Sequence, residues 1–308
     1  MSCGITAIVD SVDYRAAAAA DDVRGWFAGW ERALSRFQPD SELSQLNGGD
    51  AEHVRPISAE LTLALGAALE AARWSEGLVV PTVLGALEAA GYGRSFETIA
   101  LLDGEMESDV VVPDWRGIYL DAGRRHVRLP AGVRIDLGGT AKGWAADRAV
   151  LRLAAAGPAL VDAGGDIAIS GPMSDGSLWP IAVADPRAPD HELALLLIGQ
   201  GGVATSGRDQ RRWRRGGEWQ HHIIDPRTGR PARTDVLSAT VVGPSALDAE
   251  VAAKVVLLRG AEEGMAWIEE RASFAALVVR ANGDVLTSRR IASYRWSDEL
   301  AGRCADEQ

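Results

Sequence analysis

The chain has 308 residues, and 47% of them are hydrophobic, which is enough for a sizeable buried core. Aspartate and glutamate number 43 against 32 lysines and arginines, and the net charge of −11 argues against a nucleic-acid partner, which needs a basic face. No stretch approaches the roughly 20 apolar residues of a membrane span. The two cysteines, Cys3 and Cys304, stand near opposite ends, so we expect free thiols. The N-terminal residues lack the pattern of a secretory signal or lipoprotein anchor, so we expect a cytoplasmic protein.

The first third of the chain predicts mainly helices, because its apolar residues recur at a spacing near 3.6. Pro39 ends the first long helix, and Ser58 is suited to cap the second. In chain order we expect a strand over 4–10, a helix over 14–36, a loop with a short capped turn over 35–47, a helix over 58–75 and a short helix within 78–91.

Residues 135–147, with the sequence IDLGGTAKGWAAD, are the most informative segment. Apolar residues and an aspartate lead into a double glycine, and a lysine with an apolar helix face follows. We therefore expect a strand, a tight turn and a helix that continues to about residue 156. Short strands with a hairpin turn at Asp121 are expected before this segment, over about 108–136.

The second half of the chain predicts more strand than helix. The expected elements are a buried strand over 158–170 interrupted by its aspartates and glycines, a β-rich region over 178–243, two helical pieces over 245–271 broken at Gly260, and a hairpin over 274–287 around Asn282 and Gly283. Strands mixed with helices, without regular βαβ alternation, predict an α+β fold in a single domain over 1–308, with a core over about 4–290 and a tail over 291–308.

The glycine turn could bind a ligand. The first N–H groups of a helix have no partner within the helix and carry the positive end of its dipole, which suits phosphate oxygens. Asp136 and Lys142 would bracket such a ligand with one negative and one positive charge. Glycines in such a turn also serve plain packing, so this motif by itself leaves both interpretations open.

Two further motifs place charged side chains in apolar surroundings. Asp162 and Asp166 flank a second double glycine, and they either accept turn N–H groups or face a polar site. Glu250 and Lys254 stand four residues apart on one helix face, where a surface ion pair is the simplest interpretation.

The region 203–231 gathers five arginines around Trp213 and continues into His221 and His222. A solvated loop is the plain interpretation of the arginines. Adjacent residues of a strand point to opposite faces, so we expect one histidine to face inward, either as a satisfied core group or as a base near neutral pH.

Together these segments are similar to those of a known family, and they occur in its order: SRFQPDSELSQLN, VVPTVLGALEAAGYG, IDLGGTAKGWAAD, ALVDAGGDIAISG, VATSG and HHIIDPRTGRP, followed by a helix that ends in VVLLRG. Over about residues 34–290 the chain resembles the ApbE family of FAD:protein FMN transferases. The resemblance implies an α+β, T-fold-type antiparallel sheet core with packed helices. It also implies an enzyme that uses FAD and Mg²⁺ to move FMN onto a threonine or serine hydroxyl of a partner protein as a phosphoester, with release of AMP.

The resemblance also implies roles for individual residues. His222 matches the histidine proposed to deprotonate the acceptor hydroxyl, and the Gly139 carbonyl would ligate the metal. The residues that would contact FAD are Phe37, Pro81, Thr82, Val83, Asp136, Lys142 and Ile223.

Two departures from the family pattern matter. Counting back from Gly260 places Glu250 and Lys254 where the family offers a metal-binding aspartate and threonine. Counting forward from Asp248 would instead put Ala252 at the threonine position. The other departure is Cys3-Gly4-Ile5 in place of Met-Gly-Thr.

Three functions are open. The chain could be the transferase, with lysine either tolerating the metal or standing in for part of its charge. It could be a pyrophosphatase that hydrolyses FAD to FMN and AMP, or a flavin-binding protein that has lost metal catalysis.

Overall fold

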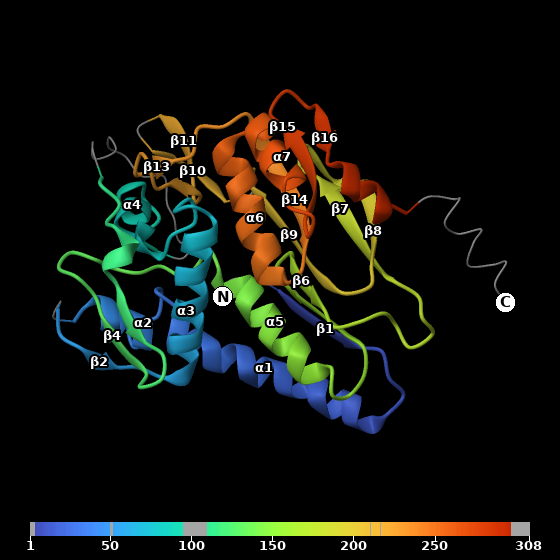
Figure 1. Ribbon diagram of the computed structural model, residues 1–308, viewed down its shortest axis with the longest axis horizontal. Helices are drawn as coiled ribbons and strands as arrows, with labels where there is room; N and C mark the ends of the chain where they lie inside the picture. The colour runs from blue at the N-terminus through green and yellow to red at the C-terminus, as the bar shows by residue number, and fades with distance from the viewer. Residues whose placement is uncertain (1–3, 50–51, 95–109, 210, 216, 297–308) are drawn as a thin grey trace.

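The computed structural model is built around one twisted antiparallel sheet with helices on one face and a hairpin on the other (Figure 1). The structure describes residues 4–49, 52–94, 110–209, 211–215 and 217–296. The mixture of strands and helices in the sequence predicts this α+β arrangement in a single domain, and the structure confirms it.

The central sheet has seven strands in the order β1-β5-β6-β9-β14-β15-β16, and every neighbouring pair is antiparallel. These strands are β1 (Ile5–Val9), β5 (Ala159–Ala163), β6 (Asp166–Ile169), β9 (Gly201–Gly207), β14 (Val236–Gly243), β15 (Ala275–Arg280) and β16 (Val285–Thr287). This order places β1, from the start of the chain, beside β5, from its middle. The sheet is therefore complete only when segments distant in the sequence have paired.

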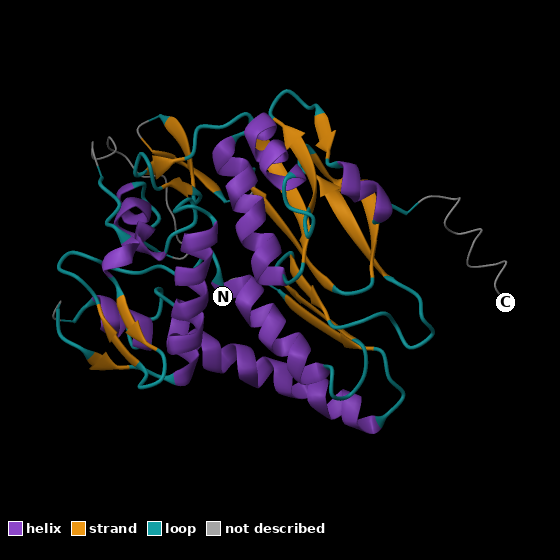
Figure 2. Cartoon of the chain, viewed as in Figure 1, coloured by secondary structure: helices purple, strands orange, loops and turns teal. Residues whose placement is uncertain are grey.

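Five helices account for most of the packed helical layer (Figure 2). They are α1 (Tyr14–Leu34), α3 (Ala59–Trp74), α5 (Ala141–Leu153), α6 (Ala246–Arg259) and α7 (Ala261–Glu269). The side chains of α1 that pack inward recur every three or four residues, as in Phe27, Trp30 and Leu34. Val241 and Ala276 pack with α6 and α7 beneath this layer.

The opposite face of the sheet is covered by the hairpin of β7 (Trp179–Asp185) and β8 (Ala188–Ile198). Alternate residues of the same sheet strands, such as Val242 and Leu277, pack against this hairpin. The alternation follows from the two-residue period of a strand and gives the sheet two apolar faces. The 3-10 helix η4 (Arg289–Ser293) packs here through buried Ile291.

Smaller elements lie to the left in Figure 1, beside α3. They are α2 (Glu42–Asn47), the 3-10 helix η1 (Pro81–Val83), α4 (Leu84–Ala89), the 3-10 helix η3 (Trp115–Gly117), the sheet of β2 (Arg55–Pro56), β4 (His126–Arg128) and β3 (Tyr119–Asp121), and the hairpins β10 (Arg212–Arg215) with β11 (Glu218–His221) and β12 (Ile224–Asp225) with β13 (Arg230–Pro231). Trp213 joins the β10–β11 hairpin to α4, because its indole nitrogen donates to the Ala90 carbonyl at 2.9 Å.

Several local predictions are confirmed. The Ser58 hydroxyl accepts the Leu61 N–H and caps α3. Gly260 separates α6 from α7 with a φ of 86°, in the left-handed region that favours glycine. The hairpin turn at Asp121 joins β3 to β4, and the one at Asn282 joins β15 to β16.

Two predictions are wrong. Residues 158–170 form two strands, β5 and β6, joined by a turn in which Gly164 and Gly165 have φ values of 69° and 91°. The segment before the glycine turn is not a strand. It has no ladder partner among the described residues, and its backbone bonds to a side chain instead: Asn47 Oδ1 accepts the Ile135 N–H at 2.7 Å, and Asn47 Nδ2 donates to the Ile135 carbonyl at 2.8 Å.

Among the described residues, no helix is both long enough and apolar enough to cross a bilayer. Cys3 and Cys304 lie outside the described residues, so their expected free state stays a prediction.

Candidate active site

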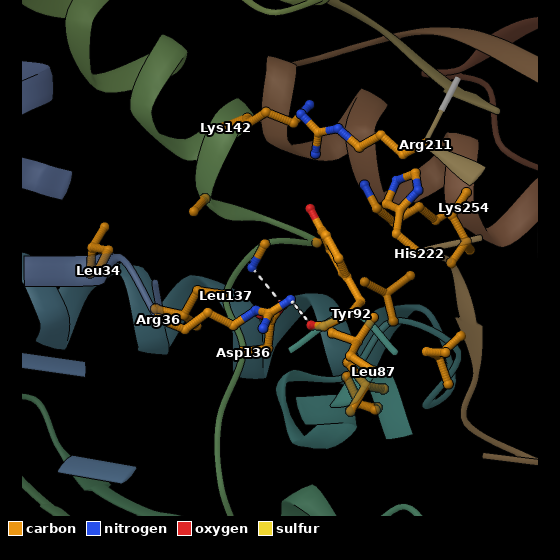
Figure 3. A pocket seen from close by; sticks show the side chains of 18 of the residues that line it. Leu34, Arg36, Leu87, Tyr92, Asp136, Leu137, Lys142, Arg211, His222 and Lys254 are labelled. Atoms are coloured by element: carbon orange, nitrogen blue, oxygen red, sulfur yellow. Dashed lines mark hydrogen bonds and ion pairs between the residues drawn. The ribbon is translucent and has the colours of Figure 1, made fainter. Parts of the chain in front are cut away.

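A cavity of about 260 Å³ opens where the small elements meet the helical layer (Figure 3). Its walls come from five separate parts of the chain. They are residues 31–38 at the end of α1, 78–92 around α4, 136–142 at the glycine turn, Arg211 and 222–224 of the hairpin region, and Lys254 and Leu258 of α6. One side of the cavity is apolar, and Lys142, Arg211, His222 and Lys254 converge at the other.

Arg36 joins the apolar wall to the glycine turn. Its guanidinium carbon lies 4.1 Å from the ring centre of Phe37 and 4.7 Å from that of Tyr92. The guanidinium also donates to the Tyr92 carbonyl at 2.8 Å and pairs with Asp136 Oδ2 at 2.6 Å. The Arg36 and Asp136 side chains are only 6% and 8% exposed, so the loss of either would leave a buried, unpaired charge.

Asp136 shapes the turn itself. Its Oδ1 accepts the Gly138 N–H at 2.8 Å, and its own N–H donates to the Pro81 carbonyl at 2.7 Å. The Thr140 N–H and hydroxyl both point back to the Leu137 carbonyl before α5 begins at Ala141. The turn is therefore held in place by bonds that do not depend on a ligand.

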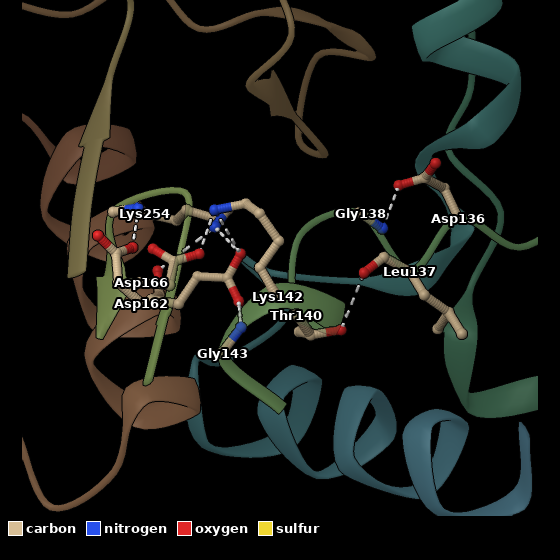
Figure 4. A network of polar contacts seen from close by, with 11 residues as sticks. Asp136, Leu137, Gly138, Thr140, Lys142, Gly143, Asp162, Asp166 and Lys254 are labelled. Atoms are coloured by element: carbon tan, nitrogen blue, oxygen red, sulfur yellow. Dashed lines mark hydrogen bonds and ion pairs between the residues drawn. The ribbon is translucent and has the colours of Figure 1, made fainter. Parts of the chain in front are cut away.

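A four-residue charge cluster forms the far end of the cavity (Figure 4). Lys254 Nζ lies 3.0 Å from Glu250 Oε1, and Lys142 Nζ lies 3.9 Å from the same oxygen. Lys142 also forms an ion pair with Asp166, and the Gly143 N–H donates to Glu250 Oε2 at 3.0 Å. Both carboxylates are 1% exposed, whereas the two lysines line the cavity.

Burial and charge act against each other in this cluster. Burial raises the pKa of Asp166 to about 6, against the lowering effect of Lys142. Burial would also raise the pKa of Glu250, but Lys254, Lys142 and the Gly143 N–H outweigh it and hold that pKa below its usual value. Burial opposes the charge on Lys142, yet Asp166 and Glu250 raise its pKa overall. Lys142 is therefore a cation at neutral pH.

The cluster depends on a close approach of α5 and α6. A Cβ on Gly143 would lie 2.7 Å from the Ala246 carbonyl oxygen and from the Leu247 backbone nitrogen. Asp147, one turn further along α5, accepts the N–H groups of Ala246 and Leu247 at 2.8 and 3.0 Å. Burial raises the pKa of Asp147 to about 6. The absence of a side chain at Gly143 thus lets its own N–H reach Glu250.

The two adjacent histidines have different environments. His221 Nε2 bonds to the Ala232 carbonyl at 3.0 Å, and its Nδ1 accepts the Ile223 N–H, so it is a satisfied core residue. His222 lines the cavity, and its buried Nδ1 has no hydrogen-bond partner among the described residues. Burial, together with the positive charges of Arg211 and Lys254, lowers the pKa of His222 well below its usual value. His222 is therefore neutral at pH 7 and able to accept a proton.

Most of the residues predicted from the sequence meet at this cavity. Those that line it are Phe37, Val83, Asp136, Gly139, Lys142, His222, Ile223 and Lys254, and Glu250 lies directly behind the two lysines. Pro81 and Thr82 are not among the lining residues. Pro81 supports the turn through its carbonyl, and the buried Thr82 hydroxyl donates to the Pro113 carbonyl at 2.7 Å.

The structure also shows which interpretation of the charged residues on α6 and beside the second double glycine is correct. Glu250 and Lys254 do form an ion pair, but it is buried rather than on the surface. Asp248 belongs to the N-terminal cap of α6, since it bonds to the Ser245 hydroxyl, and Ala252 lies in the apolar core. The residues that face the glycine turn are therefore Glu250 and Lys254. Asp162 accepts the Gly165 N–H at 2.6 Å, whereas Asp166 faces the polar cluster.

Sequence reasoning missed Arg36, Tyr92 and Arg211 as parts of the site. Arg36 and Tyr92 stand inside the segments that carry the family resemblance, but nothing local shows that they stack on each other. The sequence around Arg211 predicts a solvated loop, and only the packing of the hairpin on α4 shows that Arg211 faces the cavity.

The side chains at the charge cluster do not fit a divalent cation held by Glu250 and Lys254. An ammonium group accepts no metal, and Lys254 Nζ already takes the position beside Glu250 Oε1 where a cation would bind. Among the described residues, no group of three or more histidine, cysteine, aspartate or glutamate side chains could hold a metal ion.

Comparison with known proteins agrees with the family resemblance found in the sequence. The ApbE family model matches residues 1–278. The FAD:protein FMN transferase of Treponema pallidum is 31% identical over 291 residues, which cover 86% of this chain and 80% of that protein. That of Vibrio cholerae is 27% identical and covers 80% and 75% of the two chains.

Solved structures show the same fold. The ApbE protein of Thermotoga maritima superposes with a TM-score of 0.81 at 25% identity and covers 95% of both chains. The flavin transferase ApbE of Vibrio cholerae superposes with a TM-score of 0.75 at 22% identity and covers 96% of both. Because the family model covers residues 1–278, we conclude that the chain belongs to the ApbE family.

Proposed function

We propose that this protein is an FAD:protein FMN transferase. The observation that carries the proposal is the cavity, in which an apolar wall runs into a cluster of cations beside a neutral histidine. Phe37 lines the cavity yet is 41% exposed, so it offers apolar surface for a flavin ring. Lys142, Lys254 and Arg211 offer positive charge for a pyrophosphate.

His222 is the base in this proposal. The acceptor hydroxyl oxygen forms a bond to the phosphorus of the FMN half, and its proton moves to His222. The bond from that phosphorus to the bridging oxygen breaks, and AMP leaves with the electron pair. Phosphoryl transfer of this kind depends on positioning and charge neutralisation more than on covalent chemistry by the protein. The cations at the cluster are placed to supply that neutralisation.

The Mg²⁺ requirement that the family resemblance implies is not part of this proposal, because the side chains at Glu250 and Lys254 do not suit the ion. The acceptor is proposed to be a protein with an accessible serine or threonine hydroxyl. The cytoplasmic location stays a prediction.

The test is direct. The purified protein is incubated with FAD and a candidate acceptor, with Mg²⁺ in one sample and EDTA in another, and AMP is measured by chromatography. Transfer predicts an acceptor mass gain that matches FMN and is lost when the acceptor hydroxyl is replaced by hydrogen. Formation of free FMN and AMP without acceptor modification would indicate a pyrophosphatase. FAD binding with no AMP in either sample would indicate a flavin-binding protein and contradict the transferase.

A further inference from the structure

The chain has only two lysines, and they meet at one end of the cavity. Of its 32 lysine and arginine residues, 30 are arginine, and the two lysines are Lys142 and Lys254. They are far apart in the sequence, yet both ammonium groups approach the same oxygen, Glu250 Oε1. Lysine carries a compact point charge, whereas arginine presents a broad planar fork. The chain therefore places its two compact cations side by side at the polar end of the cavity.

The position of Lys254 is set by its surroundings. Its side chain is 13% exposed, and its Cε lies 3.7 Å from the point where a Cβ on Gly139 would stand. The aliphatic stem thus runs along the glycine turn, and Glu250 holds the ammonium at its end. Gly139 and Glu250 are two of the three positions that the resemblance assigns to the metal; the Lys254 stem lies beside the first, and its ammonium lies beside the second.

Both oxygens of Glu250 already have partners. Its Oε1 pairs with Lys254 and its Oε2 accepts the Gly143 N–H. A divalent ion at Glu250 would have to displace the Lys254 ammonium and then lie beside it, and like charges at such a distance repel. An ammonium therefore already occupies the position beside Glu250 where a metal would bind.

We propose that Lys254 replaces the divalent metal of the transfer reaction, with Glu250 as the residue that positions it. The ammonium neutralises the pyrophosphate of FAD and the charge that develops on the bridging oxygen as AMP leaves. This inference rests on the proposed transferase function and makes that function independent of divalent cations.

The experiment compares three forms of the full-length protein in EDTA and in MgCl₂. Wild-type protein is expected to release AMP and modify the acceptor at rates within about twofold in the two conditions. Lys254→Thr, which removes the ammonium and supplies a hydroxyl oxygen, is expected to lose at least about 100-fold in EDTA, as when one stabilising donor of a transition state is removed, and to regain activity with Mg²⁺. Lys254→Met, with neither charge nor oxygen, is expected to stay inactive in both conditions.

Binding gives a second readout that does not need turnover. Calorimetry with FAD in EDTA is expected to show binding to the wild type that weakens at least about tenfold in Lys254→Met, a loss of about 1.4 kcal/mol. Titration of MgCl₂ into the FAD-loaded wild type is expected to show no binding heat. Arg259→Met is the matched control, because it removes one positive charge from the same helix outside the cavity.

The outcomes separate the two proposals. Transfer by the wild type that stops in EDTA and returns with Mg²⁺ would overturn the role of Lys254 and leave the transferase function intact. If neither condition gives AMP, the transferase function fails and binding decides the inference. FAD binding in EDTA that depends on Lys254 would support it, and FAD binding that requires Mg²⁺ would overturn it.

Discussion

At the scale of single residues, His221 and His222 show how neighbours in sequence take different roles. His221 uses both ring nitrogens within the core, whereas His222 faces the cavity with a buried nitrogen that has no partner among the described residues. A buried polar atom without a partner is destabilising by about 1–3 kcal/mol. In the proposed reaction His222 is the base, so its place at the cavity has a use that the fold alone does not explain.

Replacement of His222 by alanine tests this role. His222→Ala is expected to lower the transfer rate by about 100- to 10,000-fold, the range for loss of a general base, while FAD still binds through the cations and the apolar wall. Acceptor modification is followed by mass spectrometry and FAD binding by calorimetry. Transfer at the wild-type rate would remove His222 from the mechanism.

The pH dependence of the reaction gives an independent check on the same residue. A base must be neutral, so kcat/KM falls as pH drops through the pKa of His222 in the free enzyme. Burial and the charges of Arg211 and Lys254 hold this pKa well below the usual 6.5. The acidic limb of kcat/KM is therefore expected below pH 6.5. A limb at or above 6.5, or one that persists unchanged in the residual activity of His222→Ala, would contradict this assignment.

At the scale of elements, the site depends on how closely α5 crosses α6. Gly143 gives both the space for the crossing and the N–H that binds Glu250, and Asp147 caps α6 from α5. At this separation Lys142 on one helix and Lys254 on the other both reach Glu250.

A methyl group at this crossing should therefore affect both stability and activity. Gly143→Ala would place a Cβ against the backbone of α6, and we expect a loss of about 1–3 kcal/mol in the free energy of unfolding, with weaker FAD binding as the cluster shifts. Urea unfolding and calorimetry measure the two effects. Gly25→Ala is the matched control, because a Cβ there meets nothing within 4 Å. That change is expected to stabilise α1 by up to about 1 kcal/mol. Equal effects from the two substitutions would refute the close-packing argument.

At the scale of the whole molecule, the cavity joins segments that are otherwise packed in separate clusters. Its walls combine residues of the α1 and α5 core, the α6 core and the small α4 cluster. A ligand in the cavity therefore contacts all three clusters at once and is expected to stabilise the protein as one unit.

This coupling predicts a single unfolding transition, and we expect FAD to shift its midpoint to a higher urea concentration. At a free FAD concentration 100 times its dissociation constant, the gain in the free energy of unfolding is expected to be about 2.7 kcal/mol. Urea unfolding followed by tryptophan fluorescence measures it. NAD⁺ is the control, since it has the same adenosine and pyrophosphate but no flavin ring to contact Phe37 and Tyr92. Two separate transitions, or equal stabilisation by NAD⁺, would show that the cavity does not act in this way.

Much of the local structure could be predicted, because local rules decide it. The Ser58 cap, the break at Gly260 and the hairpin at Asn282 each depend on residues within a few positions of one another. The strand expected before the glycine turn failed because its partner is the Asn47 side chain, 88 positions earlier in the chain. No periodicity in the residues near Ile135 carries that information.

The amino-acid sequence by itself determined the family, the α+β class and the residue types of the site, because motif order and short-range spacing carry them. Only the tertiary structure decided that Glu250 and Lys254, rather than Asp248 and Ala252, face the glycine turn, and that Arg36, Tyr92 and Arg211 belong to the cavity. The physical reason is that the role of a charged side chain depends on the groups that surround it. Burial and the choice of partner arise only when α5, α6 and the β10–β11 hairpin pack together.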